Sequence, residues 1–265
     1  MEKKNQKVNN SIFEIIAHKQ QGNIKSLAVL IDPDKTDIDQ CKRLVDMANE
    51  CLVDFFFVGG SLITTNNMHL IIKTIKANCN IPVLIFPGST LHIDANADGL
   101  LFLSLISGRN PELLIGQHVI SAPIIKSSNL EVISTGYILI DCGHQTSVSY
   151  ISNTTPIPHD KPSIAACTAM AGEMLGMKTI FLDSGSGAQR SIDRKTIAYV
   201  RKAVDCPLIV GGGIDTAGKA VDALSAGADI IVIGNGIERQ PSLLIEVSDR
   251  IKEYNQTQKE NRLIQ

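Results

Sequence analysis

Short apolar runs rich in β-branched residues alternate with segments of helical periodicity along the whole chain. The apolar runs predict eight strands, at residues 26–31, 53–58, 82–86, 99–105, 137–140, 179–182, 208–210 and 229–233. Amphipathic patterns predict helices between most of them, at residues 36–50, 67–78, 112–125, 163–176, 193–204, 216–226 and from 241 onward. This alternation predicts an α/β protein with a parallel sheet, and eight repeats predict a (β/α)8 TIM barrel.

A further helical pattern precedes the first strand. Residues 11–20 place isoleucines at helical spacing behind Ser11, which is a suitable N-cap. We expect this helix to lie within an N-terminal extension, residues 1–25, and to close the bottom of the barrel. The chain has 265 residues, a length that one barrel domain accounts for, so we predict a single domain over residues 1–265.

The alternation breaks between the third and fourth predicted strands. Only about ten residues connect them, too few for a crossover helix with its loops. The connection contains Pro87, Gly88 and several Asp and Asn residues, which favour turns. We therefore expect a modified barrel in which the helix after the third strand is missing or replaced. The apolar flank exposed by such a gap is a suitable place for an apolar ligand.

Two glycine clusters follow the last two predicted strands, at residues 211–213 and 234–236. Glycines at a strand end that precede a helix let backbone N–H groups approach an anion closely. TIM barrels bind phosphate with the loops after strands seven and eight. The alternative is that these glycines only permit tight turns. Their occurrence on successive final strands favours a phosphate site.

Polar residues that follow the predicted strands are the candidates for chemistry, because barrel active sites lie at the carboxyl ends of the strands. They are Asp32, Asp34, Lys35, Ser61, Ser89, Arg109, Asn110, Asp183, Ser184, Ser186 and Asn235. These oxygen-rich side chains without a histidine favour a hard cation such as Mg²⁺ over zinc. A long polar segment, residues 142–160, is expected to be functional. No lysine stands at a strand end, which argues against a Schiff-base aldolase.

Composition narrows the possible partners. The chain is 44% hydrophobic and 20% charged with a formal net charge of −2, so it can bury a large core but has no excess of positive charge for nucleic acid. No apolar run reaches the roughly 18 residues that a membrane-spanning helix needs. We therefore expect a cytoplasmic protein with at most peripheral membrane contact. The six cysteines include no CxxC pair, which suggests neither zinc nor a disulfide framework.

An ordered set of motifs carries a family resemblance. The set consists of Asp32-Pro33-Asp34-Lys35, Gly59-Gly60-Ser61, Phe86-Pro87-Gly88-Ser89, Ser107-Gly108-Arg109-Asn110-Pro111, Leu182-Asp183-Ser184-Gly185-Ser186-Gly187-Ala188, Gly211-Gly212-Gly213-Ile214 and Gly234-Asn235-Gly236. Each motif alone is weak, but their order and spacing are specific. From about residue 30 to 238 the chain resembles the geranylgeranylglyceryl phosphate synthase family, which includes the PcrB-like prenyltransferases.

The resemblance implies a prenyltransferase that joins the C3 hydroxyl of sn-glycerol 1-phosphate to a prenyl diphosphate, here geranylgeranyl diphosphate, through an ether bond. It implies a Mg²⁺ site at Asp32 and Ser61. The glycerol-phosphate site that it implies consists of Phe181, Leu182, Asp183, Ser184, Gly185, Ser186, Gly187, Gly212, Gly213, Gly234 and Asn235. We also expect peripheral membrane contact for product release, and the exposed flank favours a homo-oligomer.

Two positions depart from the family pattern. The family's Tyr-x-Glu reads Phe181-Leu182-Asp183, which removes a phenol and shortens the carboxylate by one methylene, and Leu30 stands where one branch has lysine. We predict that Asp183 is the catalytic base, that Mg²⁺ at Asp32 neutralises the leaving diphosphate, helped by Arg109 or Lys35, and that the flank without a helix takes the lipid tail.

Other functions remain open on the residues alone. A phosphosugar isomerase or lyase and an FMN oxidoreductase share the glycine-rich phosphate loops. A non-catalytic barrel that binds phosphoglycerol would follow if the change to Asp183 has removed turnover. Asp32 and Asp34 are also ordinary turn residues, and Arg109 is equally suited to a solvated surface.

Overall fold

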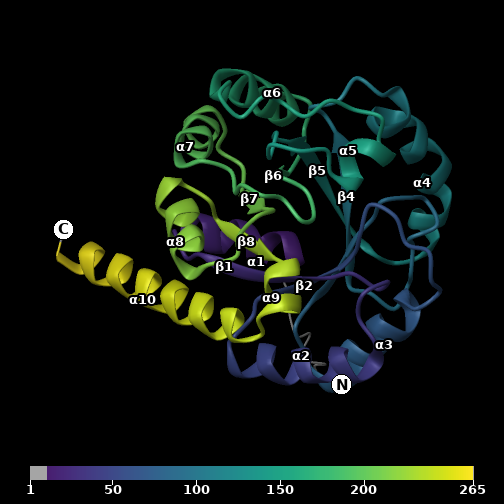
Figure 1. Ribbon diagram of the computed structural model, residues 1–265, viewed down its shortest axis with the longest axis horizontal. Helices are drawn as coiled ribbons and strands as arrows, with labels where there is room; N and C mark the ends of the chain where they lie inside the picture. The colour runs from purple at the N-terminus through teal and green to yellow at the C-terminus, as the bar shows by residue number, and fades with distance from the viewer. Residues whose placement is uncertain (1–10, 265) are drawn as a thin grey trace, which may run out of the picture.

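The computed structural model describes residues 11–264, so the part of the predicted N-terminal extension before Ser11 lies outside the described residues. Eight parallel strands form a closed barrel in chain order (Figure 1). They are β1 (Ser26–Ile31), β2 (Phe55–Gly59), β3 (Val83–Phe86), β4 (Gly99–Leu105), β5 (Glu131–Leu139), β6 (Thr179–Asp183), β7 (Leu208–Gly211) and β8 (Ile230–Ile233). The TIM-barrel fold predicted from the alternating pattern is confirmed.

Most of the helices surround the strands on the outside of the barrel, while α1 lies across one end of it (Figure 1). The helices are α1 (Ile12–Gln21), α2 (Ile38–Glu50), α3 (Met68–Asn78), the π-helix η1 (Glu112–Gly116), α4 (Gln117–Ser127), α5 (Ser147–Ile151), α6 (Pro162–Met174), α7 (Arg194–Ala203), α8 (Ala217–Ala226), α9 (Asn235–Arg239) and α10 (Ser242–Ile264). The short helices α5 and α9 were not predicted. Between residues 11 and 264, none of the helices combines the length and the apolar composition needed to cross a bilayer.

The alternation of side chains along each strand divides the core into two layers. Inward positions such as Phe57, Leu101 and Phe181 fill the barrel interior. Outward positions such as Val58 and Ile180 pack against the surrounding helices. Because the parallel strands are buried on both faces, they read as continuous apolar runs, and this is why the sequence pattern located most of them.

Helix α1 closes the amino-terminal end of the barrel, as predicted. Ile12 and Ile16 are buried in the same cluster as the inward strand residues. Ser11 caps the helix, and its side chain accepts a hydrogen bond from the Glu14 backbone. Glu131, at the start of β5, accepts hydrogen bonds from the backbone N–H groups of Ile12 and Phe13 at 2.6 and 2.8 Å. The carboxylate thereby satisfies first-turn donors that otherwise lack partners.

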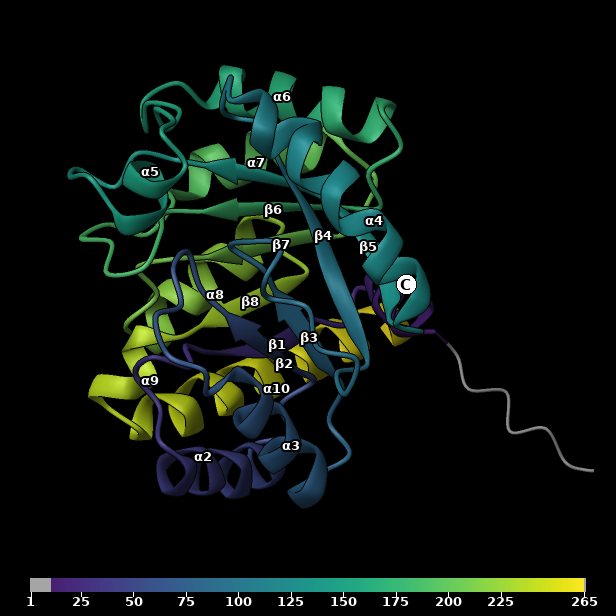
Figure 2. The ribbon, with the colours of Figure 1, turned by 90° about the vertical axis from the view of Figure 1, so that its right-hand side faces the viewer.

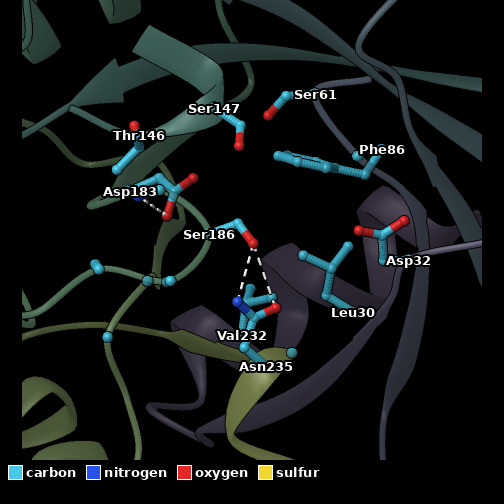
Figure 3. Close-up of a pocket in the computed structure, with 18 of the residues that line it drawn as sticks. Leu30, Asp32, Ser61, Phe86, Thr146, Ser147, Asp183, Ser186, Val232 and Asn235 are labelled. Atoms are coloured by element: carbon cyan, nitrogen blue, oxygen red, sulfur yellow. Dashed lines mark hydrogen bonds between the residues drawn. The ribbon is translucent and has the colours of Figure 1, made fainter. Parts of the chain in front are cut away.

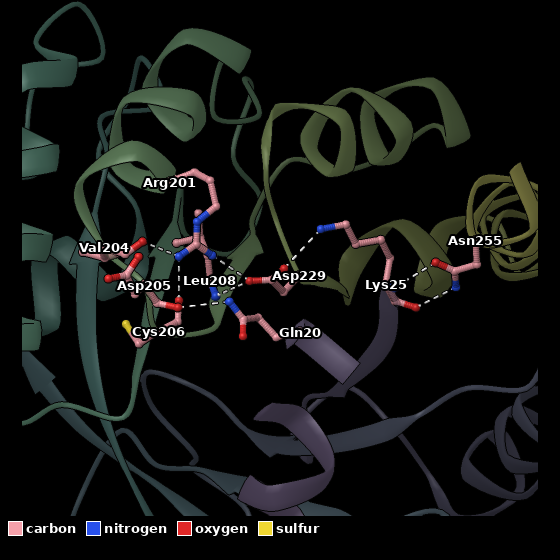
Figure 4. A network of polar contacts seen from close by, with 9 residues as sticks. All are labelled: Gln20, Lys25, Arg201, Val204, Asp205, Cys206, Leu208, Asp229 and Asn255. Carbon is pink, nitrogen blue, oxygen red and sulfur yellow. Dashed lines mark hydrogen bonds and ion pairs between the residues drawn. The ribbon is translucent and has the colours of Figure 1, made fainter. Parts of the chain in front are cut away.

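A buried ion network lies at the same end of the barrel (Figure 4). Asp229, just before β8, pairs with Lys25 at 3.1 Å and with Arg201 of α7 at 2.8 Å. It also accepts a hydrogen bond from the backbone N–H of Leu208 at 3.0 Å. Asn255 of α10 exchanges two hydrogen bonds with the Lys25 backbone. The network thus joins the starts of β1, β7 and β8 to two outer helices.

The connection from β3 to β4, residues 87–98, contains no helix, as predicted. Figure 2 faces this flank, where β4 crosses the front between α3 and α4. A shallow groove, here called the β4 groove, lies over the strand. It is lined by Pro87, Gly88, Ser89, Thr90, Ile93, Leu100, Phe102, Leu103, Leu113, Gln117, His118, Ser121 and Ile125.

Several predicted boundaries differ from the observed ones by one or two residues, and two of the wrong boundaries have a clear physical cause. β5 begins at Glu131 rather than residue 137, because residues 131–137 pair one to one with β4. The polar Thr135 interrupts the apolar pattern, so the sequence did not predict this half of the strand. The Thr135 hydroxyl is nevertheless buried and hydrogen bonds to that of Thr179 at 2.9 Å. Helix α2 is capped by Asp37, not by Thr36, because Asp37 and Gln40 form a reciprocal capping box.

Candidate active site

A cavity of about 800 Å³ opens at the carboxyl ends of the strands. The loops after β1, β2, β6, β7 and β8 contribute to its wall, as do residues 145–151 in and beside α5. Figure 3 shows Asp183 and Ser186 on one side of this space and Asp32 on the other, with Leu30 and Phe86 between them. One bowl therefore collects side chains from opposite sides of the barrel, as the fold predicts.

Most of the sequence-predicted site residues line this cavity. They are Asp32, Ser61, Phe181, Asp183, Gly185, Ser186, Gly187, Gly212, Gly213, Gly234 and Asn235. Two do not. Leu182 points outward into the layer between strands and helices. The Ser184 hydroxyl is buried beside the cavity wall, without a hydrogen-bond partner among the described residues.

The loops after β6, β7 and β8 form one glycine-rich wall. Gly187 has a φ of +76°, and a Cβ there would meet only the Asn235 amide at 3.8 Å, so the backbone faces open space. Ser186 and Asn235 hydrogen bond to each other across the wall, the Asn235 amide donating to the Ser186 hydroxyl at 3.0 Å (Figure 3). Bare backbone beside hydroxyl and amide groups suits a phosphate.

Asp183 ends β6 inside the cavity and is only 8% exposed. Its Oδ1 accepts a hydrogen bond from the backbone N–H of Gly185 at 2.9 Å. Its Oδ2 accepts a short hydrogen bond from the Tyr137 hydroxyl of β5. Burial raises the pKa of the Asp183 carboxyl, while the hydrogen bonds from Tyr137 and Gly185 act in the opposite direction. A carboxylate with a raised pKa is a stronger base than an exposed one.

Asp32 lies on the other side of the cavity. Its Oδ1 accepts a hydrogen bond from the Asp34 backbone at 3.1 Å, and its Oδ2 lies 2.9 Å from the Lys35 ammonium. Gly60 faces the carboxylate, since a Cβ there would lie 3.7 Å from it, and Ser61 follows directly. The β1 and β2 loops therefore bring a carboxylate, a hydroxyl and a cation to one rim.

A four-bond clamp joins these two loops. The Asp34 carboxylate accepts hydrogen bonds from the backbone and hydroxyl of Thr64 at 2.6 and 2.8 Å, and from those of Thr65 at 2.9 and 2.7 Å. Burial acts to raise the pKa of Asp34, but the four hydrogen bonds outweigh it and hold the pKa well below its usual range. Asp34 is therefore ionised and ties the β1 loop to the β2 loop.

Arg109 does not line the cavity, so the structure lends no support to its predicted help with the diphosphate. Its guanidinium donates to carbonyl groups of its own loop, at 2.8 Å to that of Gly108. Lys35 does line the cavity, and so does Arg239 of α9, which sequence reasoning missed. The helix that carries Arg239 is only five residues long, too short to give a clear periodic signal.

Tyr137, Thr146 and Ser147 are further cavity residues that the sequence did not single out. Thr146 caps α5, and a Cβ on Gly185 would come within 2.9 Å of its hydroxyl, so α5 packs closely against the β6 loop. Tyr137 could have been predicted from its position near the end of β5. Because side chains alternate along a strand, Tyr137 points into the barrel together with Leu139.

The β4 groove lies next to the cavity at the end of β3, since Phe86 lines the cavity and the following residue, Pro87, lines the groove. The groove is mostly apolar, with leucine, isoleucine and phenylalanine side chains. Burial lowers the pKa of both buried histidines of this flank, His92 and His118, so they stay neutral at neutral pH. An uncharged groove beside a polar bowl fits a ligand with an anionic head and a hydrocarbon tail.

Comparisons with known proteins agree with this arrangement. The model of the PcrB family matches residues 20–256. Geranylgeranylglyceryl phosphate synthase of Spirosoma linguale is 54% identical over 233 residues, which are 88% of this chain and 94% of that protein. The protein of the same name from Chitinophaga pinensis is 54% identical over 244 residues, 92% of this chain and 97% of that protein.

One solved structure is that of (S)-3-O-geranylgeranylglyceryl phosphate synthase from Thermoplasma acidophilum, in complex with its substrate sn-glycerol-1-phosphate. It superposes with a TM-score of 0.87 at 32% identity, and the match covers 92% of this chain and 99% of that chain. These similarities confirm both the predicted barrel and the family resemblance carried by the ordered motifs.

Proposed function

The chain belongs to the PcrB family, and on that premise we propose that it is a prenyltransferase acting on sn-glycerol 1-phosphate and geranylgeranyl diphosphate. The products are geranylgeranylglyceryl phosphate and diphosphate. The observation that supports this proposal most strongly is that the glycine-rich loops, Asp183 and Asp32 all line one cavity, which lies beside the apolar β4 groove. This matches the three parts of the reaction, which are a phosphate, a diphosphate and a hydrocarbon chain.

The glycerol phosphate binds in the glycine-rich wall with its C3 hydroxyl toward Asp183. In the reaction that hydroxyl oxygen forms a bond to the first carbon of the prenyl chain. The bond from this carbon to the diphosphate breaks, and its electron pair leaves with the diphosphate. The hydroxyl proton passes to Asp183, which later releases it to water. Holding both substrates in one bowl supplies the orientation that the step requires.

Magnesium fits the residues of the opposite rim. Its protein donors would be the Asp32 carboxylate and the Ser61 hydroxyl, both oxygen ligands. Within residues 11–264, no three His, Cys, Asp or Glu side chains group as a metal site, so phosphate oxygens and waters would complete the coordination. The bound ion would neutralise charge on the leaving diphosphate. Lys35 adds a positive charge at the same corner.

The same proposal includes the location of the enzyme in the cell and its oligomeric state. An amphiphilic product favours a cytoplasmic protein that contacts a membrane peripherally when it releases the product. Exposed apolar side chains on α4, namely Val119 (64% exposed), Ile120 (59%) and Ile124 (53%), support a homo-oligomer.

The direct test is incubation of the protein with Mg²⁺, radiolabelled sn-glycerol 1-phosphate and farnesyl, geranylgeranyl or longer prenyl diphosphates. We expect label to enter the organic phase, with the greatest yield for geranylgeranyl diphosphate. Radiolabelled sn-glycerol 3-phosphate, the enantiomer of the proposed substrate, is the matched control and should give far less extractable label. Absence of extractable label with every prenyl diphosphate would reject the proposal, and a yellow protein would favour the flavin alternative.

A further inference from the structure

The phenol of Tyr137 and the carboxylate of Asp183 meet inside the cavity wall, and both are nearly buried, at 5% and 8% exposure. The Tyr137 hydroxyl donates to Oδ2, and the backbone N–H of Gly185 donates to Oδ1. One donor comes from β5 and the other from the β6 loop. Each carboxylate oxygen therefore has a fixed partner, and a carboxylate oxygen retains a second lone pair for a ligand in the cavity.

The Tyr137 ring is held in place on two sides. Tyr137 pairs in register with Phe181 on the neighbouring strand, and the ring centroids of these residues lie 5.5 Å apart. Phe86 of β3 packs edge to face against it at 5.7 Å. The phenol is thus fixed by packing before any substrate binds, which is the condition for positioning a catalytic group.

We propose that Tyr137 is a positioning residue for the reaction, whose phenol orients the Asp183 carboxylate and keeps it in the ionised form that accepts a proton. This rests on the proposed function, in which Asp183 is the base. Position 181, two residues before Asp183 on β6, carries phenylalanine, so the phenol that contacts Asp183 comes from Tyr137 on β5.

The groups around Tyr137 favour a protonated phenol that donates its hydrogen bond to Asp183. Burial raises the pKa of Tyr137 well above its usual value, and the adjacent Asp183 charge acts in the same direction. Tyr137 therefore keeps its proton at neutral pH, and Asp183 accepts. The other charged side chains that line the cavity are Asp32, Asp34, Lys35, Asp215, Glu238 and Arg239. They belong to the loops after β1, β7 and β8, and among the described residues none hydrogen bonds to Asp183.

The test is the variant Tyr137→Phe, which removes the hydroxyl and keeps the ring. Loss of a hydrogen bond to the ionised carboxylate raises the pKa of Asp183 further, so the acid limb of the kcat profile should move upward by about one pH unit. At pH values below the acid limbs of both proteins, the kcat of the variant should be about tenfold lower than that of the unchanged protein. The KM for glycerol phosphate should change less than about twofold. Tyr199→Phe, on the outer face of α7, is the matched control and should leave the limb in place.

A second measurement does not depend on turnover. Infrared difference spectra across a pH titration should show a buried carboxyl band that is absent in Asp183→Asn. Its midpoint should rise in Tyr137→Phe and fall when 3-fluorotyrosine, a stronger donor, replaces Tyr137. Unchanged midpoints in both variants would overturn the role of Tyr137. Shifted midpoints in a protein that forms no ether product would uphold the effect of Tyr137 on the Asp183 carboxyl and reject the proposed function.

Discussion

At the scale of single residues, Gly212 shows how closely the glycine-rich wall is packed. Its φ of +80° is a conformation that residues with a side chain rarely adopt. A Cβ there would lie 2.6 Å from Asp183 Oδ1 and 2.6 Å from the Ser184 nitrogen. The absence of a side chain therefore lets the β7 loop pack directly against the proposed base.

Asp32→Ala tests the proposed metal site at this scale. Removing the only carboxylate proposed as a Mg²⁺ ligand should abolish turnover and weaken Mn²⁺ binding, measured by electron paramagnetic resonance with diphosphate present, by at least about tenfold. Asp46→Ala, exposed on α2, is the control for a lost charge. Undiminished turnover and Mn²⁺ binding in Asp32→Ala would show that the metal assignment is wrong.

At the scale of elements, the Asp34 clamp decides how two loops meet. The β1 loop carries Asp32 and the β2 loop carries Ser61, and the strands themselves leave both loops free beyond their ends. The four hydrogen bonds to Asp34 fix the loops to each other. A hydrogen bond to a charged group contributes about 1.5–3 kcal/mol where it is well formed, so this clamp is a strong local restraint.

Asp34→Ala should release the β2 loop without unfolding the barrel. We expect amide exchange at Thr64 and Thr65 to accelerate by at least about tenfold, while exchange in β1 and β2 stays unchanged. The pKa of Asp34 is depressed in the folded protein, so the clamp is complete above the ordinary aspartate pKa and weakens only as the pH falls through the folded value. The effect should therefore be constant from about pH 5 to 8.

Asp39→Ala is the matched control for the clamp, because Asp39 carries the same charge on the exposed side of α2. It should leave both amides protected. Equal exchange rates at Thr64 and Thr65 in Asp34→Ala and in the unchanged protein would contradict the clamp.

At the scale of the whole molecule, the two ends of the barrel are built differently. The carboxyl ends of the strands are open, lined by glycines and polar side chains. The amino ends are closed by α1 and by the network of Lys25, Arg201 and Asp229. This division is usual in TIM barrels, where stability and chemistry lie at opposite ends.

Asp229→Ala should destabilise the barrel strongly, because it leaves Lys25 buried without its partner and the Leu208 N–H without its acceptor. Breaking a buried ion pair from one side costs about 3–5 kcal/mol of the free energy of unfolding, measurable by urea denaturation. Asp222→Ala, which breaks an exposed pair with Arg194, should cost less than about 1 kcal/mol. An equal loss in the free energy of unfolding in the two variants would show that the buried network contributes no more to stability than an exposed ion pair.

Much of the architecture followed from the sequence alone. Strand positions, the cap at Ser11, the missing helix after β3 and the glycine clusters after β7 and β8 depend on local periodicity, turn chemistry and connection length. These properties depend on residues close together in the chain, so they can be predicted from the sequence. The ordered motifs went further and predicted the family, which the comparisons confirm.

Contacts between distant segments were decided only by the tertiary structure. The first half of β5 is a strand because β4 pairs with it. Tyr137 meets Asp183 because two neighbouring strands align their ends, 46 positions apart in sequence. Such contacts depend on register and barrel closure, which are properties of the folded chain, whereas side-chain type and periodicity are written in the sequence itself.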